Sequence, residues 1–295
     1  MATGTASRAL LFGLLAAFFW GTHSVIVRAL TADLHGMTIA VLRLYIAAAA
    51  LFVILKISGH TVRLFQVDRP FLITVFGTAT NYIFFHWGLE YTGASNAMML
   101  ENTAPLFVLG ILFLTGQSRT RMELVATCVV VAGVFFTVRK DLALGGAGLT
   151  GYILELLAGL TWAIFIIGSN QALSATNGTL ERIAFLFRVF LVSAIILTPL
   201  LALEGDAVSA ITGPDVLLLL CLGILPTAVA YFLWYEAAAR VSTVTSALLF
   251  TLSIIFTFIN AALFLGEAVT PGMLIGAVLI IAGVLLSKYG SKPAT

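Results

Sequence analysis

The residues best suited to chemistry in this sequence are polar side chains embedded in long apolar stretches. Glu101 belongs to a stripe with the helical spacing i, i+3, i+4, i+7, made of Met98, Glu101, Asn102 and Pro105. A buried carboxylate is costly unless it faces a wet cavity or a partner. Glu101 therefore suits contact with a substrate ammonium group or the carrying of a proton. A structural pairing with Arg43 or His86 would satisfy the same cost, and both interpretations stay open.

Further candidates sit at comparable depth in other apolar stretches. Trp20 and Trp162 lie near the centres of their stretches, where the aromatic belts of membrane surfaces do not explain them. Aromatic faces suit flat or cationic groups, and packing against neighbouring helices is the alternative. The remaining candidates for substrate contact are His23, Asn81, Tyr82, His86, Tyr231 and Ser253.

Other polar and aromatic residues in the apolar stretches are given structural roles. Trp234 and Tyr235 lie at the end of a stretch and are expected to anchor it at the membrane surface. Arg43 and Arg188 are expected to snorkel or to bond neighbouring helices, and contact of one of them with a substrate carboxylate is the alternative. Glycine and proline loosen the ladder of helix hydrogen bonds. Hinges are therefore predicted at Gly21, Pro105, Gly168 and Pro226.

The composition shows which elements must position these side chains. Hydrophobic residues make up 61% of the chain and charged residues only 9%, against roughly 25% charged in a soluble domain. About 20 apolar residues cross a bilayer as a helix. Such stretches predict an all-α integral membrane protein with ten transmembrane helices, at residues 9–29, 36–57, 70–89, 94–115, 121–138, 150–171, 180–202, 214–235, 242–265 and 270–288.

Several classes of function are excluded by what the sequence lacks. The loops are too short for a soluble domain, and no GxxxxGK[ST] phosphate loop is present. No HExxH motif, aspartate pair within the spans or GxGD motif supports an intramembrane enzyme. We therefore expect no catalytic residues, no metal, no cofactor and no nucleic-acid partner. The two cysteines, Cys128 and Cys221, are expected to be buried small hydrophobes without a disulfide.

The chain contains an internal repeat. Residues 88–138 align with residues 238–288 at an offset of 150 without a gap, so that Ala97 matches Ala247 and Gly116 matches Gly266. Upstream, Trp20 corresponds to Trp162 at an offset of 142. The sequence predicts a first five-helix repeat over residues 1–145 and a second over residues 146–295.

Loop charges predict how the repeats are oriented, because positive residues stay on the cytoplasmic side. With the N-terminus inside, cytoplasmic segments hold ten Lys and Arg residues, and outer segments hold three. Five spans is an odd number, so the second repeat must enter upside down. The loop after the second stretch is basic and its counterpart after the seventh is acidic, as inversion requires. We predict two inverted repeats with both termini in the cytoplasm.

An inverted repeat offers two near-equivalent packings, one open to each side, around a site near the midplane. Transport by alternating access is therefore the leading hypothesis. The order of Trp20-Gly21, Arg43, Pro105 and Gly266-Glu267 resembles the drug/metabolite transporter superfamily, EamA-type branch. Within it, the chain is most similar to the bacterial aromatic amino acid exporters. This resemblance implies a central cavity lined by the first four spans and spans six to nine, with the fifth and tenth peripheral.

The expected function is export of aromatic and other hydrophobic amino acids across a bacterial inner membrane. Uniport is predicted, because no paired acids form an evident path for protons or sodium ions in the sequence. Proton-coupled efflux of flat cationic drugs or metabolites is the alternative. The expected partners are a small-molecule substrate, such as an amino acid or related metabolite, and the lipid bilayer. A monomer is favoured.

Overall fold

The computed structural model describes residues 2–117, 120–138, 148–204 and 211–287, and over these residues every regular element is a helix. Seven helical segments are long and apolar enough to span a bilayer, and Pro271–Ser287 is a shorter apolar helix. Together with α3 and α6, these segments fit the ten predicted stretches. The structure thus confirms an all-α fold of the multi-pass membrane type.

Six of the ten stretches form one helix each and four are divided. The single helices are α1 (Ala2–Leu30), α2 (Gly36–Ile57), α3 (Arg69–Tyr91), α6 (Arg121–Val138), α7 (Gly148–Leu173) and α13 (Pro271–Ser287). The divided stretches are α4 (Ala94–Glu101) with α5 (Ala104–Leu114), α8 (Thr179–Leu197) with η2 (Thr198–Leu203), α9 (Gly213–Leu222) with η4 (Gly223–Val229) and α10 (Ala230–Ala238), and α11 (Thr243–Phe250) with α12 (Ser253–Phe264).

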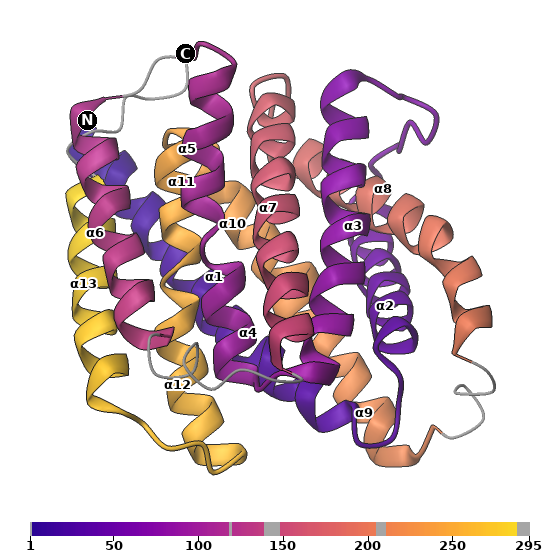
Figure 1. Cartoon of the computed structure of the whole chain (residues 1–295). Helices are drawn as coiled ribbons and strands as arrows, with labels where there is room; N and C mark the ends of the chain where they lie inside the picture. The colour runs from indigo at the N-terminus through magenta and orange to yellow at the C-terminus, as the bar shows by residue number, and fades with distance from the viewer. Residues whose placement is uncertain (1, 118–119, 139–147, 205–210, 288–295) are drawn as a thin grey trace.

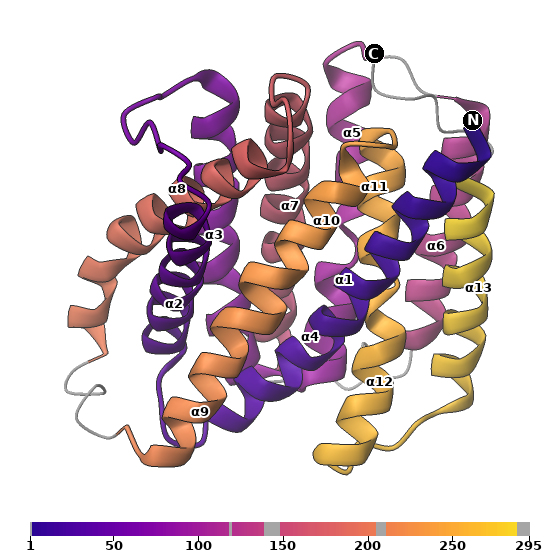
Figure 2. The same ribbon diagram turned by 180° about the vertical axis from the view of Figure 1, so that it is seen from behind.

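Equivalent helices of the two repeats run in opposite directions. The start of α1 and the end of α13 lie at the same end of the bundle, called here the terminal end (Figures 1 and 2). From that end α1 runs away, whereas α7, its repeat equivalent, runs toward it (Figure 1). The proposed boundary between residues 145 and 146 lies outside the described residues. The directions are those that an inverted pair of repeats requires.

The core of the molecule lies between the first and second halves of the chain. The main helix contacts pair α3 with α7, α6 with α13, α2 with α8, and α1 with both α10 and α12. Each pair joins one helix from each half. Side chains that face these interfaces are therefore shared between the two repeats.

Two divided stretches are interrupted at equivalent positions. The break between α4 and α5 falls at Asn102 and Thr103, and the break between α11 and α12 falls at Thr251 and Leu252, which is 150 residues after Asn102. At each break, a side chain donates a hydrogen bond to a backbone carbonyl of the preceding turn. Asn102 Nδ2 donates to Met98 O at 2.7 Å, and Thr251 Oγ1 donates to Leu248 O at 2.6 Å. Discontinuous helices of this kind are how membrane carriers expose backbone near a binding site.

The predicted hinge at Pro226 is a π-helical segment, η4, within the α9–α10 span. Proline has no N–H to donate, so the ladder of helix bonds is disturbed at this point. Thr227 Oγ1 donates to Leu222 O at 2.7 Å, five residues earlier in the chain.

No hinge is present at Gly21 or Gly168, where α1 and α7 continue as regular helices. These glycines allow close helix contact instead. A Cβ at Gly21 would lie 2.1 Å from Phe256 Cβ, and a Cβ at Gly168 would lie 2.8 Å from Thr74 N. Glycine is required at these two positions by packing between the halves.

Helices α6 and α13 pack on each other at the edge of the bundle. A Cβ at Gly133 would lie 2.8 Å from Gly276 O, and a Cβ at Gly272 would lie 2.7 Å from Phe136 O. Small residues permit such close approach of helix backbones in membrane proteins. Gly272 and Gly276, which form a GxxxG sequence in α13, therefore pack against α6 of the same chain.

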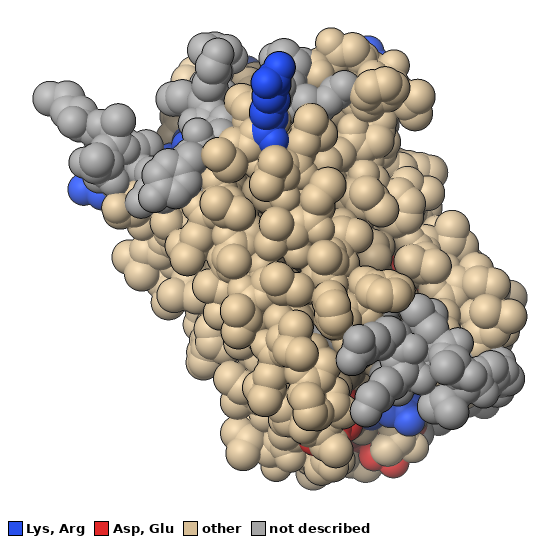
Figure 3. Space-filling view, turned by 60° about the vertical axis from the view of Figure 1, so that its left-hand side comes forward, with Lys and Arg blue, Asp and Glu red and all other residues tan. Residues whose placement is uncertain are grey.

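The outer surface of the bundle is suited to lipid. Large apolar side chains such as Phe113, Leu217 and Phe264 are about 70% exposed. In Figure 3 the broad middle of the face shown is free of Lys, Arg, Asp and Glu, which gather toward its ends. Cys128 is also exposed and Cys221 half-buried, so the prediction that both are buried is wrong. A helix that is apolar all round does not reveal which side faces its neighbours.

The prediction that Trp234 and Tyr235 anchor the membrane surface is also wrong. Both side chains are fully buried. Trp234 Nε1 donates to Ser246 O at 3.0 Å, and the Tyr235 hydroxyl lies 2.8 Å from Ser169 Oγ. Their polar atoms are satisfied inside the protein, because α10 packs against α1, α8 and α11 rather than facing lipid.

Candidate functional site

A cluster of aromatic rings lies between the two halves near the middle of the bundle. Trp20 and Trp162 are in contact at a centroid distance of 5.6 Å, and each contacts Tyr231, at 5.4 and 5.5 Å. Phe250 closes the cluster at 5.1 Å from Trp20 and 4.8 Å from Trp162. Edge-to-face arrangements dominate, as the ring quadrupoles favour. The predicted pairing of Trp20 with Trp162 is thus a direct contact.

Arg43 links the two halves beside this cluster. Its side chain is 1% exposed and lies over the Tyr82 ring at 4.9 Å. Arg43 Nε and Nη2 donate to Thr227 Oγ1 at 3.0 and 2.8 Å. The π-helical segment makes this possible, because it directs the Thr227 hydroxyl proton to Leu222 O and leaves the oxygen free to accept. Arg43 therefore bonds a neighbouring helix, as expected of it, and does so across the repeat boundary.

Two histidines accept from the same guanidinium. Arg43 Nη1 contacts His23 Nε2 and lies 3.5 Å from His86 Nε2. Because arginine nitrogens only donate, both ring nitrogens act as acceptors. His86 Nδ1 in turn donates to Tyr82 O at 2.8 Å. In this geometry His86 is a neutral, bonded side chain.

Glu101 is buried opposite Arg43 and bonds an amide rather than the arginine. Glu101 Oε1 accepts from Asn81 Nδ2 at 2.9 Å, and the same Nδ2 donates to Ala158 O of α7 at 3.0 Å. The structural pairing of Glu101 is therefore with Asn81, not with Arg43 or His86. The Asn81 amide joins α3, α4 and α7 at one point.

These side chains enclose a central chamber that is closed in this structure. Its volume is about 10 Å³, which is room for roughly one water molecule. Eight of the predicted contact residues line it, and Arg43, Phe85 and Phe250 complete it. The full lining is Trp20, His23, Arg43, Asn81, Tyr82, Phe85, His86, Glu101, Trp162, Tyr231 and Phe250.

Three predicted contact residues, Met98, Asn102 and Ser253, are buried but do not line the chamber. Asn102 bonds Met98 O at the break between α4 and α5. Ser253 Oγ donates to Phe250 O at 2.7 Å and lies 3.5 Å from Met98 Sδ. These residues hold the two equivalent helix breaks together behind the chamber wall.

Glu155 on α7 is a buried carboxyl that sequence reasoning missed. Its side chain has no exposed surface, and neither carboxyl oxygen has a hydrogen-bond partner among the residues that the structure describes. A Cβ at Gly88 would lie 2.4 Å from Glu155 Oε1, so the glycine leaves room for the carboxyl. The acidic residue inside the sixth apolar stretch was the available signal. Glu155 is more deeply buried than Glu101.

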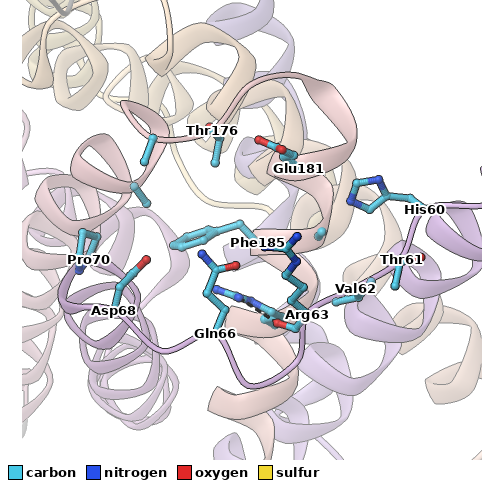
Figure 4. A pocket seen from close by; sticks show the side chains of 14 residues that line it. His60, Thr61, Val62, Arg63, Gln66, Asp68, Pro70, Thr176, Glu181 and Phe185 are labelled. Atoms are coloured by element: carbon cyan, nitrogen blue, oxygen red, sulfur yellow. Dashed lines mark hydrogen bonds between the residues drawn. The ribbon is translucent and has the colours of Figure 1, made fainter.

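A second, much wider pocket opens at the terminal end, and we call it the terminal pocket. It measures about 590 Å³ and lies between the loop after α2 and the adjoining ends of α7 and α8 (Figure 4). Arg188 lines it while only 6% exposed, with its guanidinium over the Phe71 ring at 4.6 Å. Arg188 Nη1 donates to Arg63 O at 3.1 Å, and Nε has no hydrogen-bond partner.

Acidic groups share the terminal pocket with Arg188. Asp68 and Glu181 lie on opposite sides of the Phe185 ring in the close view (Figure 4). Charges of both signs beside apolar rings suit a ligand that carries both an anionic and a cationic group.

Comparison with known proteins identifies the family. The model of the EamA-like transporter family matches residues 7–139 and again residues 149–289. The chain belongs to the EamA-like transporter family. It is accordingly a membrane transporter and not an enzyme, and each of its halves carries one copy of the EamA unit.

Several relatives of this EamA-like chain carry transporter names. A transporter of Archaeoglobus fulgidus without assigned substrate is 30% identical over 73% of this chain and 74% of its own length. The threonine/homoserine exporter RhtA of Escherichia coli K12 is 32% identical over 68% of this chain and 64% of its own length. The transporter YwfM of Bacillus subtilis is 26% identical over 94% of this chain and 92% of its own length.

A solved structure shares the fold of this EamA-like chain. A crystal structure whose chain is 18% identical superposes with a TM-score of 0.75, covering 95% of this chain and 97% of that one. Within the described residues, no group of three His, Cys, Asp or Glu side chains is placed to hold a metal ion.

Proposed function

We propose that this chain exports amino acids by alternating access through the central chamber, with aromatic and other hydrophobic amino acids as preferred substrates. The observation that carries the proposal is the chamber itself, which lies between the halves and is lined by repeat-related pairs. Trp20 faces Trp162, and Tyr82 and Tyr231 line the same space. Aromatic walls favour aromatic and apolar side chains of a solute.

The charges of the chamber also fit an amino acid. Arg43 and Glu101 both line it, and Trp162 Nε1 is a buried donor without a partner. A zwitterion would set its carboxylate toward Arg43 and its ammonium group toward Glu101. The alternative of flat cations is less favoured, because Arg43 places a fixed positive charge in the space such a ligand would occupy.

The chamber must open before a solute can enter, since about 10 Å³ holds no amino acid. We propose that the terminal pocket takes up solute from the cytoplasm, with Arg188 near the solute carboxylate and Asp68 or Glu181 near its ammonium group. Phe185 contacts Tyr235 at 6.1 Å, and Phe165 contacts Tyr231 at 5.4 Å. Rearrangement of these rings would join the terminal pocket to the chamber.

The remaining predictions stay proposals. Residues 1–145 and 146–295 would form the two repeats, both termini would face the cytoplasm, and the protein would act as a monomer in a bacterial inner membrane. The uniport prediction rested on the lack of paired acids in the spans. It did not take into account Glu155 of α7, which is a second buried acid besides Glu101.

Export of threonine and homoserine is a second candidate, because the exporter RhtA is 32% identical. The test is counterflow in proteoliposomes that contain the purified chain. Vesicles are preloaded with unlabelled solute and receive labelled L-phenylalanine or labelled L-threonine. Faster exchange of phenylalanine supports the aromatic proposal, and faster exchange of threonine supports the second candidate. No exchange of either solute, by protein that remains monodisperse, rejects amino acid export.

A further inference from the structure

The buried charges near the chamber do not balance if every group is ionised. Among the described residues, Arg43 is the one arginine or lysine that lines the chamber, whereas two buried carboxyls, Glu101 in its wall and Glu155 on α7, lie in this region. Arginine stays charged in proteins. One carboxylate balances it, and a second, unpaired negative charge would be left in a water-free interior at a high cost. The set is neutral when one of the two carboxyls carries a proton.

The contacts indicate which carboxyl holds that proton. Glu101 Oε1 accepts from Asn81 Nδ2 at 2.9 Å, and an amide donor stabilises a carboxylate. Among the described residues, neither oxygen of Glu155 has a donor, and the residue is completely buried against Gly88. Glu155 is therefore the protonated member in this closed state.

Along α7, Glu155 precedes the point at which this helix contacts Glu101. Glu155 is in the third turn of α7, which begins at the end opposite the terminal end (Figure 1). One turn further along α7, a Cβ at Gly159 would lie 2.9 Å from Glu101 O. Asn81 bonds both Glu101 and Ala158 O, which lies between these two positions of α7. Glu155 is the peripheral member of the pair and Glu101 the one in the chamber.

We propose that Glu155 and Glu101 form a proton-carrying pair that couples solute export to inward movement of protons. The proposal rests on the proposed function. When the outer side opens, a hydronium ion of the external water gives a proton to Glu155. One O–H bond of the hydronium breaks, and the O–H bond of the Glu155 carboxylic acid forms. That O–H bond breaks as the proton passes to Glu101, where a new one forms, and Glu101 releases it after the chamber opens inward. One solute leaves for each proton that enters.

Within the part of the chain that the structure describes, no other ionisable group hydrogen-bonds the Glu155 carboxyl. Helix α5 and helix α11, which also pack on α7, carry no titratable residue. Glu90 of α3 accepts from Gly36 N at 2.9 Å. The titratable side chains on the helices packed against α7 are Arg69, Tyr82, His86, Glu90 and Tyr91 on α3, Glu101 on α4, and Tyr231, Tyr235 and Glu236 on α10.

The first arm of the test detects the proton without any solute. Infrared difference spectra of the purified protein between low and high pH report the C=O stretch of protonated carboxyls. We expect a band in the wild type that is lost in Glu155→Gln and kept, at a shifted position, in Glu155→Asp. Glu123→Gln is the matched control, because Glu123 is also buried but accepts from Thr120 N at 2.8 Å and from Ser242 Oγ. An unchanged band in Glu155→Gln overturns the proposal.

The second arm measures coupling in proteoliposomes with labelled L-phenylalanine and L-threonine. A gradient of one pH unit sustains about a tenfold accumulation when one proton moves per solute. We expect this ratio in the wild type and in Glu123→Gln, and a ratio near one in Glu155→Gln. Accumulation driven by a sodium gradient instead, or equal accumulation by Glu155→Gln, overturns the proposal.

The two arms separate the failure of this proposal from the failure of amino acid export. If neither amino acid moves but the infrared band depends on Glu155, the proton pair stands and the substrate class is wrong. If both amino acids exchange without any response to the pH gradient, the exporter stands and the coupling is wrong.

Discussion

The role of Arg43 depends on its hydrogen-bond partners as well as on its charge. Its forked donors meet one threonine hydroxyl of the other half and two histidine nitrogens of its own half. A guanidinium can make this planar set of bonds, whereas a lysine ammonium cannot. The residue therefore acts at once as part of the chamber wall and as the bond that holds α2 to η4.

We expect Arg43→Lys to lower the apparent melting temperature and to reduce counterflow by roughly 30-fold, because loss of bonds from a buried charged group costs about 2 kcal/mol. Thr227→Val removes the same link from the other side. Thermal unfolding of both single variants and of the double variant measures the coupling. Effects that simply add would show that the two residues do not act together.

Arg188 offers the corresponding test of the terminal pocket. We expect Arg188→Gln to raise the half-saturating concentration of solute added on the side of the terminal pocket by about tenfold, the loss expected for one charged hydrogen bond. Lys56→Gln is the control, because it removes the same charge from an exposed site outside the pocket. The half-saturating concentrations are measured in oriented proteoliposomes. Equal increases for the two variants would show that Arg188 acts only through the net charge of the protein.

The internal repeat is clearer in the bounds of the helices than in the identities of their side chains. The α4–α5 and α11–α12 spans break at equivalent positions, and each ends at a glycine with φ of +69°, Gly116 and Gly266. A left-handed residue closes a helix most readily when it is glycine. Both breaks lie beside the chamber. Asn102 donates a side-chain hydrogen bond at the first break, and Ser253 donates one at the second.

Close contact between α6 and α13 is predicted to hold the edge of the bundle. We expect Gly133→Ala to lower the apparent melting temperature, since its Cβ would lie 2.8 Å from Gly276 O, and overpacking costs about 1–3 kcal/mol. Gly110→Ala on α5 is the control, because a Cβ there meets nothing within 4 Å. The control should be neutral or stabilising, as alanine favours a helix. A stable Gly133→Ala protein would show that the two helices can separate slightly without loss.

The molecule as a whole combines opposed halves with one shared, closed chamber. The α3–α7 and α2–α8 contacts bring each half against the other, so motion of one half must change the walls of the chamber. Two near-equivalent packings of this kind are the basis of alternating access.

The opposed orientation predicts the accessibility of engineered cysteines. In a background without Cys128 and Cys221, we expect an impermeant maleimide to label Gly213→Cys from outside intact cells, and Ser58→Cys only after the membrane is opened. Both positions are exposed and lie at opposite ends of the bundle (Figure 1). Labelling of both from the same side would contradict the inverted repeat.

The sequence by itself determined the spans, the repeat and eight of the eleven chamber-lining residues. Apolar stretches are local, and burial of the backbone in lipid forces each of them into a helix. Residues such as Trp20 and Glu101 stood out because they break the apolar pattern of their own stretch.

Only the tertiary structure decided how the helices are rotated toward one another. Rotation places Phe250 in the chamber, buries Trp234, Tyr235 and Glu155, and exposes Cys128. When a helix is apolar on nearly all sides, its sequence shows no contrast between a polar and an apolar face, so the sequence does not predict which side faces its neighbours. The side chains of neighbouring helices fix that orientation, and those neighbours lie far away along the chain.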